Sequence, residues 1–173
     1  YKLPMPEVCV ITHWHWDHTF GIHALRQESL AHIKTNQKLR EMSLWDWTDS
    51  AMKERLQQGI EIPFADTCMR EEYKNVNDIR VIPASTDIQD QTELDCGGIT
   101  CQCIHLPSAH SDDSIVVYVP EEKVVFIGDI YGNDLYHDSK RDLEKTKSLY
   151  KRLKILDFEI AVPGHSEPLS KDE

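Results

Sequence analysis

The stretch THWHWDHTFG, residues 12–21, places three histidines and one aspartate within six positions: His13, His15, Asp17 and His18. If this crowding served packing alone, each unpaired polar group would cost about 1–3 kcal/mol on burial. Imidazole and carboxylate groups are also the side chains that bind borderline divalent ions. The stretch therefore predicts a metal centre, and the fold must bring any remaining ligands to it.

The spacing within this stretch favours two ions over one. In an extended segment, side chains two positions apart point the same way, so His13 and His15 can reach one ion together. Asp17, two positions after His15, points the same way unless the chain turns before it. His18 is expected at the start of a helix and therefore points in another direction. One tight turn can thus serve two ions about 3.5–4 Å apart. The pattern differs from H-E-x-x-H, whose histidines lie four apart on a helix.

Three more ligand-type residues follow apolar, β-rich segments. His110 comes after CQCIHLPSA, Asp129 ends KVVFIGD, and His165 ends FEIAVPGH. His13 likewise comes directly after an apolar run, EVCVIT. Since α/β proteins place their sites where strands end at one edge of a sheet, we expect these residues to join the cluster.

The turn residues and the other histidines have simpler interpretations. Gly128 and Gly164 are expected to make turns that let the backbone come close to a crowded centre. His23, His32 and His105 are expected to be ordinary surface or core residues.

The hydrophobic pattern predicts a mixed α/β fold. Strands are expected at 7–12, 80–85, 92–106 with a turn at Gly97-Gly98, 114–120, 123–129 and 158–162, with a shorter one at 31–35. Helices are expected at 18–27, 38–47, 50–59 and 140–156, with Gly59 as a C-terminal cap of the third. Residues 61–78 show no clean period and predict a loop or insertion. Because strands come in neighbouring pairs as well as alternating with helices, the sheet is expected to be mixed.

Length, charge and cysteine usage limit the class of protein. The 173 residues fit one domain, 1–173, with a net charge of -11. That acidity argues against nucleic acid as a partner, and no apolar run approaches the ~20 residues that a membrane span needs. Five cysteines without a C-x-x-C spacing indicate free thiols and a cytoplasmic protein.

The motifs H-x-H-x-D-H, AHSDDS, FIGD and PGH, in that order, resemble the metallo-β-lactamase-fold hydrolase superfamily. The resemblance runs from about Val8 to His165. It implies an αβ/βα four-layer sandwich of the metallo-β-lactamase type and two divalent metal ions, zinc first, with iron or manganese as alternatives. It also implies seven ligands in two sets that share a bridging carboxylate: His13, His15 and His110; Asp17, His18 and His165; and Asp129 as the bridge.

This resemblance implies a dinuclear metal-dependent hydrolase. Its nucleophile would be a metal-bridging hydroxide, and Asp17 would be the catalytic residue that orients it and accepts the proton given up by the bridging water. The expected substrate is a small ester, thioester, lactone or related molecule. Either His137 or Tyr131 could protonate the leaving group, and both could equally be plain loop residues.

Two positions narrow the subclass, and alternatives stay open. The bridging position is Asp129, where many true β-lactamases of the family lack aspartate, so β-lactam cleavage is disfavoured as the native role. Position 15 is His, where the oxygen-reducing flavo-di-iron branch usually has Glu, which favours hydrolysis. The alternatives are a metal-binding or regulatory module without catalysis and a di-iron redox protein of the same fold.

The tryptophans also allow two interpretations. Trp14, Trp16, Trp45 and Trp47 could line the mouth of an apolar pocket, or they could belong to core and helix packing. Specificity in this fold depends on loops such as 61–78, which carry no readable signature.

The chain departs from the family pattern at its start. Only twelve residues precede His13, whereas the family has a substantial β-rich segment there. The tail is also short, with eight residues after His165. We therefore expect the N-terminal sheet portion to be truncated and the chain to be part of a longer polypeptide. Otherwise, a partner or second copy should cover an exposed apolar sheet face.

Overall fold

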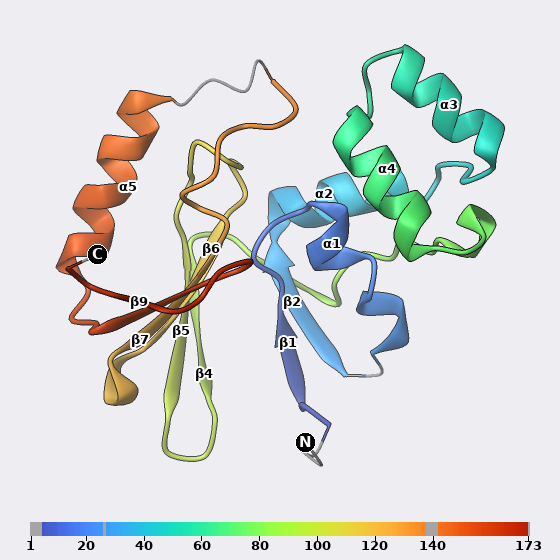
Figure 1. Ribbon diagram of the computed structural model, residues 1–173. Helices are drawn as coiled ribbons and strands as arrows, with labels where there is room; N and C mark the ends of the chain where they lie inside the picture. The colour runs from blue at the N-terminus through green and yellow to red at the C-terminus, as the bar shows by residue number, and fades with distance from the viewer. Residues whose placement is uncertain (1–4, 26, 138–141, 173) are drawn as a thin grey trace.

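A computed structural model describes residues 5–25, 27–137 and 142–172 (Figure 1). Its strands are β1 (Val8–Val10), β2 (Glu28–His32), β3 (Thr86–Ile88), β4 (Gln91–Asp95), β5 (Thr100–His105), β6 (Ile115–Val119), β7 (Val124–Gly128), β8 (Ile160–Pro163) and β9 (Leu169–Ser170). Its α-helices are α1 (Trp16–Thr19), α2 (Ile33–Met42), α3 (Asp49–Gln57), α4 (Pro63–Glu72) and α5 (Leu143–Ile155). Short 3₁₀ turns are η1 (Ile22–Ala24), η2 (Val76–Asp78) and η3 (Pro120–Glu122).

The described strands form two sheets. One has three strands in the order β1-β2-β3, and both pairings are parallel. The other has six strands in the order β4 to β9, antiparallel throughout except for the parallel pair β7 and β8. The mixed α/β class predicted from the sequence is confirmed.

The two sheets lie face to face around an inner apolar layer. Leu30 and Ile88 of the three-stranded sheet share a buried cluster with Cys103 and Ile115 of the six-stranded sheet. Successive side chains of a strand point to opposite faces. The residue after Leu30, Ala31, accordingly belongs to a different cluster on the outer face.

Helices cover the outer faces of both sheets. Ala31 shares its cluster with Leu39 of α2, and Val125 of β7 shares another with Leu149 of α5. Figure 1 shows α5 beyond the six-stranded sheet and α2 to α4 on the side of the three-stranded one. The order helix, sheet, sheet, helix is the four-layer sandwich expected above.

The segment 61–78 was predicted to be a loop, and that prediction was wrong. Pro63 begins α4, where its missing N–H is harmless and its fixed φ suits a helix. Ala65 and Met69 lie one turn apart and are buried, while Asp66 accepts from Arg70 at 2.8 Å on the next stripe. The stripe that faces the core continues to Ile62 and Tyr73, but exposed Phe64 and buried Asp66 interrupt the pattern and mask the period.

Other element boundaries also differ from the expectations. No strand forms at 80–85, where Ala84 N–H donates to the side chain of Asn36 at 2.7 Å instead of joining a ladder. The strand expected at 31–35 stops at His32, which caps α2 by accepting from the Lys34 N–H at 3.3 Å. The helix expected at 38–47 ends at Met42.

Two predicted helices at other places need adjustment. In place of the helix expected over 18–27 the structure has two short turns, α1 and η1, the second of which ends at Ala24, and residue 26 lies outside the described part of the chain. The helix expected over 140–156 is α5, and residues 140 and 141 lie outside the described part of the chain. Gly59 has φ +70 just past the end of α3, as expected of a helix-terminating glycine.

Part of the six-stranded sheet is open on the face away from α5. Phe126 of β7 and Ile160 of β8 are each 44% exposed. Val125 and Ile127, the two neighbours of Phe126 in β7, instead pack toward α5. A segment or partner over this face stays a prediction. Among the described helices, none has the length and apolarity that crossing a bilayer requires.

Candidate metal centre

The turn between β1 and α1 presents the histidine cluster as its spacing predicts. β1 ends at Val10, Trp14 and His15 lie in a bend, and α1 begins at Trp16. His13 and His15 therefore come from the segment between β1 and α1, and His18 comes from the helix. The carbonyl of Thr12 accepts from Ile115 N–H at 2.7 Å, which fixes this turn against the start of β6.

Three histidines form a buried cluster. His13, His15 and His110 are 1%, 6% and 7% exposed. The Nε2 atom of His110 lies 3.3 Å from His13 Nε2 and 3.0 Å from His15 Nδ1. The three nitrogens converge on one point, so these residues could hold one metal ion.

A second, more exposed cluster lies beside the first. It consists of Asp17, His18, Asp129 and His165, whose ligand atoms all lie within 4.8 Å of one another. His165 Nε2 lies 3.1 Å from Asp17 Oδ2 and 3.2 Å from His18 Nε2. This set mixes carboxylate and imidazole donors and could hold another ion.

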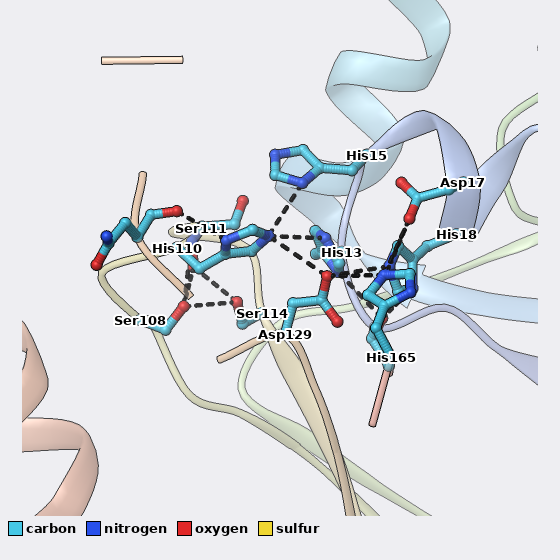
Figure 2. A network of polar contacts seen from close by, with 12 residues as sticks. His13, His15, Asp17, His18, Ser108, His110, Ser111, Ser114, Asp129 and His165 are labelled. Carbon is cyan, nitrogen blue, oxygen red and sulfur yellow. Dashed lines mark hydrogen bonds and ion pairs between the residues drawn. The ribbon is translucent and has the colours of Figure 1, made fainter. Parts of the chain in front are cut away.

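Asp129 faces both clusters. Its Oδ2 atom lies 3.3 Å from His18 Nε2, 3.2 Å from His165 Nε2 and 3.8 Å from His110 Nε2. Figure 2 shows its carboxylate between His110 on one side and His165 on the other. The structure thus brings together all seven residues singled out from the sequence, with Asp129 in the shared position.

Hydrogen bonds to the opposite ring nitrogens orient two of the histidines. His110 Nδ1 lies 2.9 Å from the carbonyl of Asn133, an acceptor that requires the proton on Nδ1 and leaves Nε2 free. His13 Nδ1 lies 3.1 Å from Thr12 Oγ1. Metal-binding histidines are oriented in this way, so the residues present fit a divalent ion.

The electrostatics of the clusters also suit a metal. Burial and the neighbouring histidine rings lower the pKa of His13, and burial with His110 lowers the pKa of His15 to about 3. Both rings are therefore neutral and can donate lone pairs at neutral pH. Burial opposes the charge on His18, but the carboxylates of Asp129 and Asp17 raise its pKa to about 9. The exposed cluster is thus poised to hold a positive charge.

Three glycines allow the backbone to approach the centre. At Gly132 a Cβ atom would lie 2.5 Å from His110 Nδ1, and at Gly164 it would overlap Asp129 Oδ1. Gly128 has φ +52, and a Cβ atom there would lie 2.9 Å from Thr12 Cβ. The expectations for Gly128 and Gly164 are confirmed, whereas Gly132 was not anticipated.

A buried hydroxyl network supports the loop that carries His110, and sequence reasoning missed it. Ser108 Oγ accepts from Ser111 N–H at 3.1 Å and lies 3.1 Å from Ser114 Oγ. Asp113, 3% exposed, accepts from Ser111 Oγ and, at 2.6 Å, from Thr35 Oγ1 of α2. The serine-rich motif AHSDDS was the available signal, since buried hydroxyls must find partners.

Two cavities open onto the centre. One, of about 920 Å³, is lined by Trp14 and Trp45 together with His15 and His110. The other, of about 540 Å³, is lined by Trp16 and by residues of both clusters. Trp47 is 8% exposed and belongs to the core. Trp14, Trp16 and Trp45 also pack against this core, so the packing interpretation holds for all four tryptophans and the cavity interpretation for these three.

The other histidines singled out from the sequence, and Tyr131, lie outside the two ligand clusters. His137 lines the larger cavity and pairs with Asp134 at 3.0 Å, while Tyr131 lines neither cavity. His32 and His105 stack with ring centroids 3.7 Å apart, which joins β2 to β5. His23 contacts the Phe20 carbonyl at 2.7 Å.

The fold consists of two helix-covered sheets, and its histidine and carboxylate clusters follow β1, β5, β7 and β8. This arrangement defines a hydrolase-type fold with a candidate metal centre. Residues 1–165 match the model of the metallo-beta-lactamase superfamily, and the chain belongs to that superfamily. Most of its members are metal-dependent hydrolases.

Solved structures show the same fold. A metallo-beta-lactamase from Pontibacter korlensis is 19% identical, with a TM-score of 0.64 over 96% of this chain and 64% of its own. The BLEG-1 B3 metallo-beta-lactamase is 21% identical, with a TM-score of 0.64 over 96% of this chain and 72% of its own. An enzyme of the same class from Hirschia baltica is 18% identical, with a TM-score of 0.59 over 96% and 64%. The chain thus spans less than two thirds of the length of the Pontibacter protein.

Proposed function

We propose that this protein is a dinuclear metal-dependent hydrolase of a small ester, thioester, lactone or related substrate. The observation that carries the proposal is the position of Asp129, whose Oδ2 atom faces the buried and the exposed cluster at once. A carboxylate shared in this way is what a two-ion centre needs to hold both ions close together.

The ligand sets follow from the two clusters. His13, His15 and His110 would hold one ion, and Asp17, His18 and His165 would hold the other, with Asp129 common to both. Zinc suits this donor set best, with iron or manganese as alternatives. When bound, the ions would supply Lewis-acid activation of the substrate carbonyl and a water ionised near neutral pH.

Asp17 is the residue that would accept a proton. Burial opposes its charge, but the neighbouring His18 lowers the pKa of Asp17, so the carboxylate is ionised at neutral pH. Its Oδ2 atom lies 3.2 Å from His18 Nε2 and 3.1 Å from His165 Nε2, which holds it beside the reaction centre.

Substrate and setting belong to the same proposal. Both cavities are of the size that small molecules occupy, and the net charge of -11 disfavours nucleic acid. The five cysteines are free, and even the nearest pair, Cys96 and Cys101, has its sulfurs 3.7 Å apart, which supports a cytoplasmic protein. Aspartate at position 129 disfavours a β-lactam as the native substrate.

A substrate panel on the zinc-loaded protein tests this function. The panel comprises an ester, a thioester, a lactone, a phosphodiester and a β-lactam, assayed with the wild type, Asp17→Asn and Asp134→Asn. We expect turnover of an acyl substrate that Asp17→Asn lowers about 100-fold or more, whereas Asp134→Asn changes little. Two zinc ions per chain without turnover of any class would support a non-catalytic module instead. Bound iron with oxygen consumption would support the redox alternative.

A further inference from the structure

The two cavities at the metal centre share one wall. His15, His110 and Tyr136 line both of them. Tyr136 is fixed there, because its hydroxyl donates to Glu61 at 2.9 Å and its ring lies 4.7 Å from that of Trp14. A molecule whose reacting group lies over these histidines can therefore extend into both cavities at once.

The smaller cavity is apolar with an acidic rim. Phe64 of α4 and Ile62, the residue before α4, line it together with Leu135. Phe64 is 65% exposed and Leu135 is 40% exposed, so both have apolar surface left to bury. Glu71 and Glu72 also line this cavity, and they disfavour an anionic group there.

The carboxylates of the larger cavity already have donors within the chain. Glu41 pairs with Lys38 at 3.2 Å, Asp112 with Lys145 at 2.6 Å, and Asp134 with His137 at 3.0 Å. Two more complete the set: Asp113 accepts from Thr35 at 2.6 Å, and Asp46 from the Thr48 N–H at 2.8 Å. These acidic groups are thus neutralised or hydrogen-bonded locally.

The lysines of this cavity have partners as well, with one exception. Lys38 also lies over Trp14 and Trp45, 5.4 and 5.3 Å from the ring centroids. Arg55, which is buried, lies over Trp45 and Trp47 and donates through Nη1 to the Asp46 carbonyl at 2.7 Å, while its Nη2 atom has no hydrogen-bond partner among the described residues.

Lys34 is the exception. It is exposed in the first turn of α2 and lines the larger cavity. Among the described residues, its ammonium group has no hydrogen bond or ion pair. At Lys34 the larger cavity therefore presents an exposed positive charge without a hydrogen bond or ion pair among the described residues, whereas Glu71 and Glu72 line the other cavity.

We propose that the substrate is an amphipathic molecule with a carboxylate, which Lys34 binds while the apolar part of the molecule lies against Phe64 and Ile62 of the α4 side. Trp14 and Trp45 then flank the segment between the carboxylate and the scissile group. This inference rests on the proposed hydrolase function and names the substrate class for it.

A matched pair of substrates tests the charge preference. Both are thioesters with the same apolar acyl group, and the thiol portion ends in a carboxylate in one and in the carboxamide in the other. We expect the wild type to favour the carboxylate in kcat/KM. Lys34→Gln should lower that value about five- to tenfold and Lys34→Glu further, with the carboxamide changing less than about twofold. Lys53→Gln, on the outer surface of α3, is the control and should leave both values unchanged.

The apolar half is tested with the same chemistry. Phe64→Ser should raise KM for the long-chain acyl thioester and leave that of the acetyl thioester unchanged, because only the long chain reaches α4. If Lys34→Gln lowers both members of the charge pair equally, or if the wild type prefers the carboxamide, the proposal is overturned.

A binding measurement separates this inference from the proposed function. The probe is the uncleavable thioether analogue of the carboxylate substrate, followed by the fluorescence change of the cavity tryptophans. Binding that Lys34→Gln weakens at least fivefold supports the inference even if no thioester is hydrolysed, in which case only the hydrolase function fails. Equal binding of the carboxylate and carboxamide analogues contradicts the inference whatever the activity.

Discussion

The Oδ2 atom of Asp129 lies 3.8 Å from Nε2 of His110, so the carboxylate that completes the exposed cluster also faces the buried one. The two residues follow different strands of the same sheet, β7 and β5, and are brought together by the antiparallel order β5-β6-β7. This relationship makes one two-ion centre, rather than two separate sites, the natural interpretation of the clusters.

Replacing Asp129 by Asn should reduce the metal content. The amide has nearly the same shape but lacks the negative charge that both ions would share, so we expect fewer than two zinc ions per chain by elemental analysis. Asp134→Asn, which alters a residue paired with exposed His137, is the control and should keep full metal content. Unchanged metal content in Asp129→Asn would remove Asp129 from the bridging position.

A methyl group at position 132 should disturb the buried cluster. A Cβ atom at Gly132 would lie 2.5 Å from His110 Nδ1, so Gly132→Ala must displace that ring or its loop. We expect zinc affinity to fall about 10–100-fold in a competition titration with a chelator. Gly21→Ala is the matched control, because a Cβ atom there meets nothing within 4 Å. Equal affinities of the two variants would contradict the proposed role of Gly132.

The hydroxyl network beneath His110 should contribute to stability. Thr35→Val removes the 2.6 Å hydrogen bond to buried Asp113 and leaves its carboxylate under-satisfied. We expect a loss of about 1–3 kcal/mol in the free energy of unfolding, measured by urea denaturation. Thr86→Val removes a similar bond, to Glu28 at 3.0 Å, from an exposed position and should cost less than about 1 kcal/mol. Similar losses in both variants would indicate that the network adds nothing beyond a surface contact.

The histidines of the metal-free protein should give an optimum of stability near pH 6.5. The pKa of His15 is lowered by burial and by His110 from 6.5 to about 3, so its stabilising contribution is lost as pH falls from 6.5 toward 3. For His18, burial is outweighed by Asp129 and Asp17, which raise its pKa to about 9. Its contribution is therefore complete below pH 6.5 and is lost between 6.5 and 9.

Urea midpoints measured from pH 4 to pH 9.5 in the presence of a chelator check this dependence. In His18→Gln the decline between pH 6.5 and 9 should flatten, while the acid side stays as in the wild type. A wild-type midpoint that rises steadily through pH 8 would contradict the charge assignment for His18.

Much of the centre could be predicted from the sequence because its ligands follow strands with clear patterns. The short apolar runs in EVCVIT and KVVFIGD indicate strands, and His13 and Asp129 come directly after them. The position of these ligands just after strands could therefore be predicted from local signals. β1 and β7 belong to different sheets, and only the tertiary structure shows that their ends meet at one site.

The support around the centre could not be predicted in the same way. Thr35 and Asp113 are 78 residues apart in the sequence, and no periodicity reports a hydrogen bond between them. α4 was missed because exposed Phe64 and buried Asp66 interrupt the apolar pattern of its core-facing stripe, Ile62, Ala65, Met69 and Tyr73. The contact between Tyr136 and Glu61 joins two segments without regular patterns, so only the tertiary structure shows it.

The most direct test of the two-ion centre is the anomalous diffraction of zinc-loaded crystals at the zinc edge. We predict two peaks per chain, about 3.5–4 Å apart, one among His13, His15 and His110 and one among Asp17, His18 and His165, with Asp129 between them. A single peak, or two peaks too far apart for Asp129 to contact both, would contradict the shared centre.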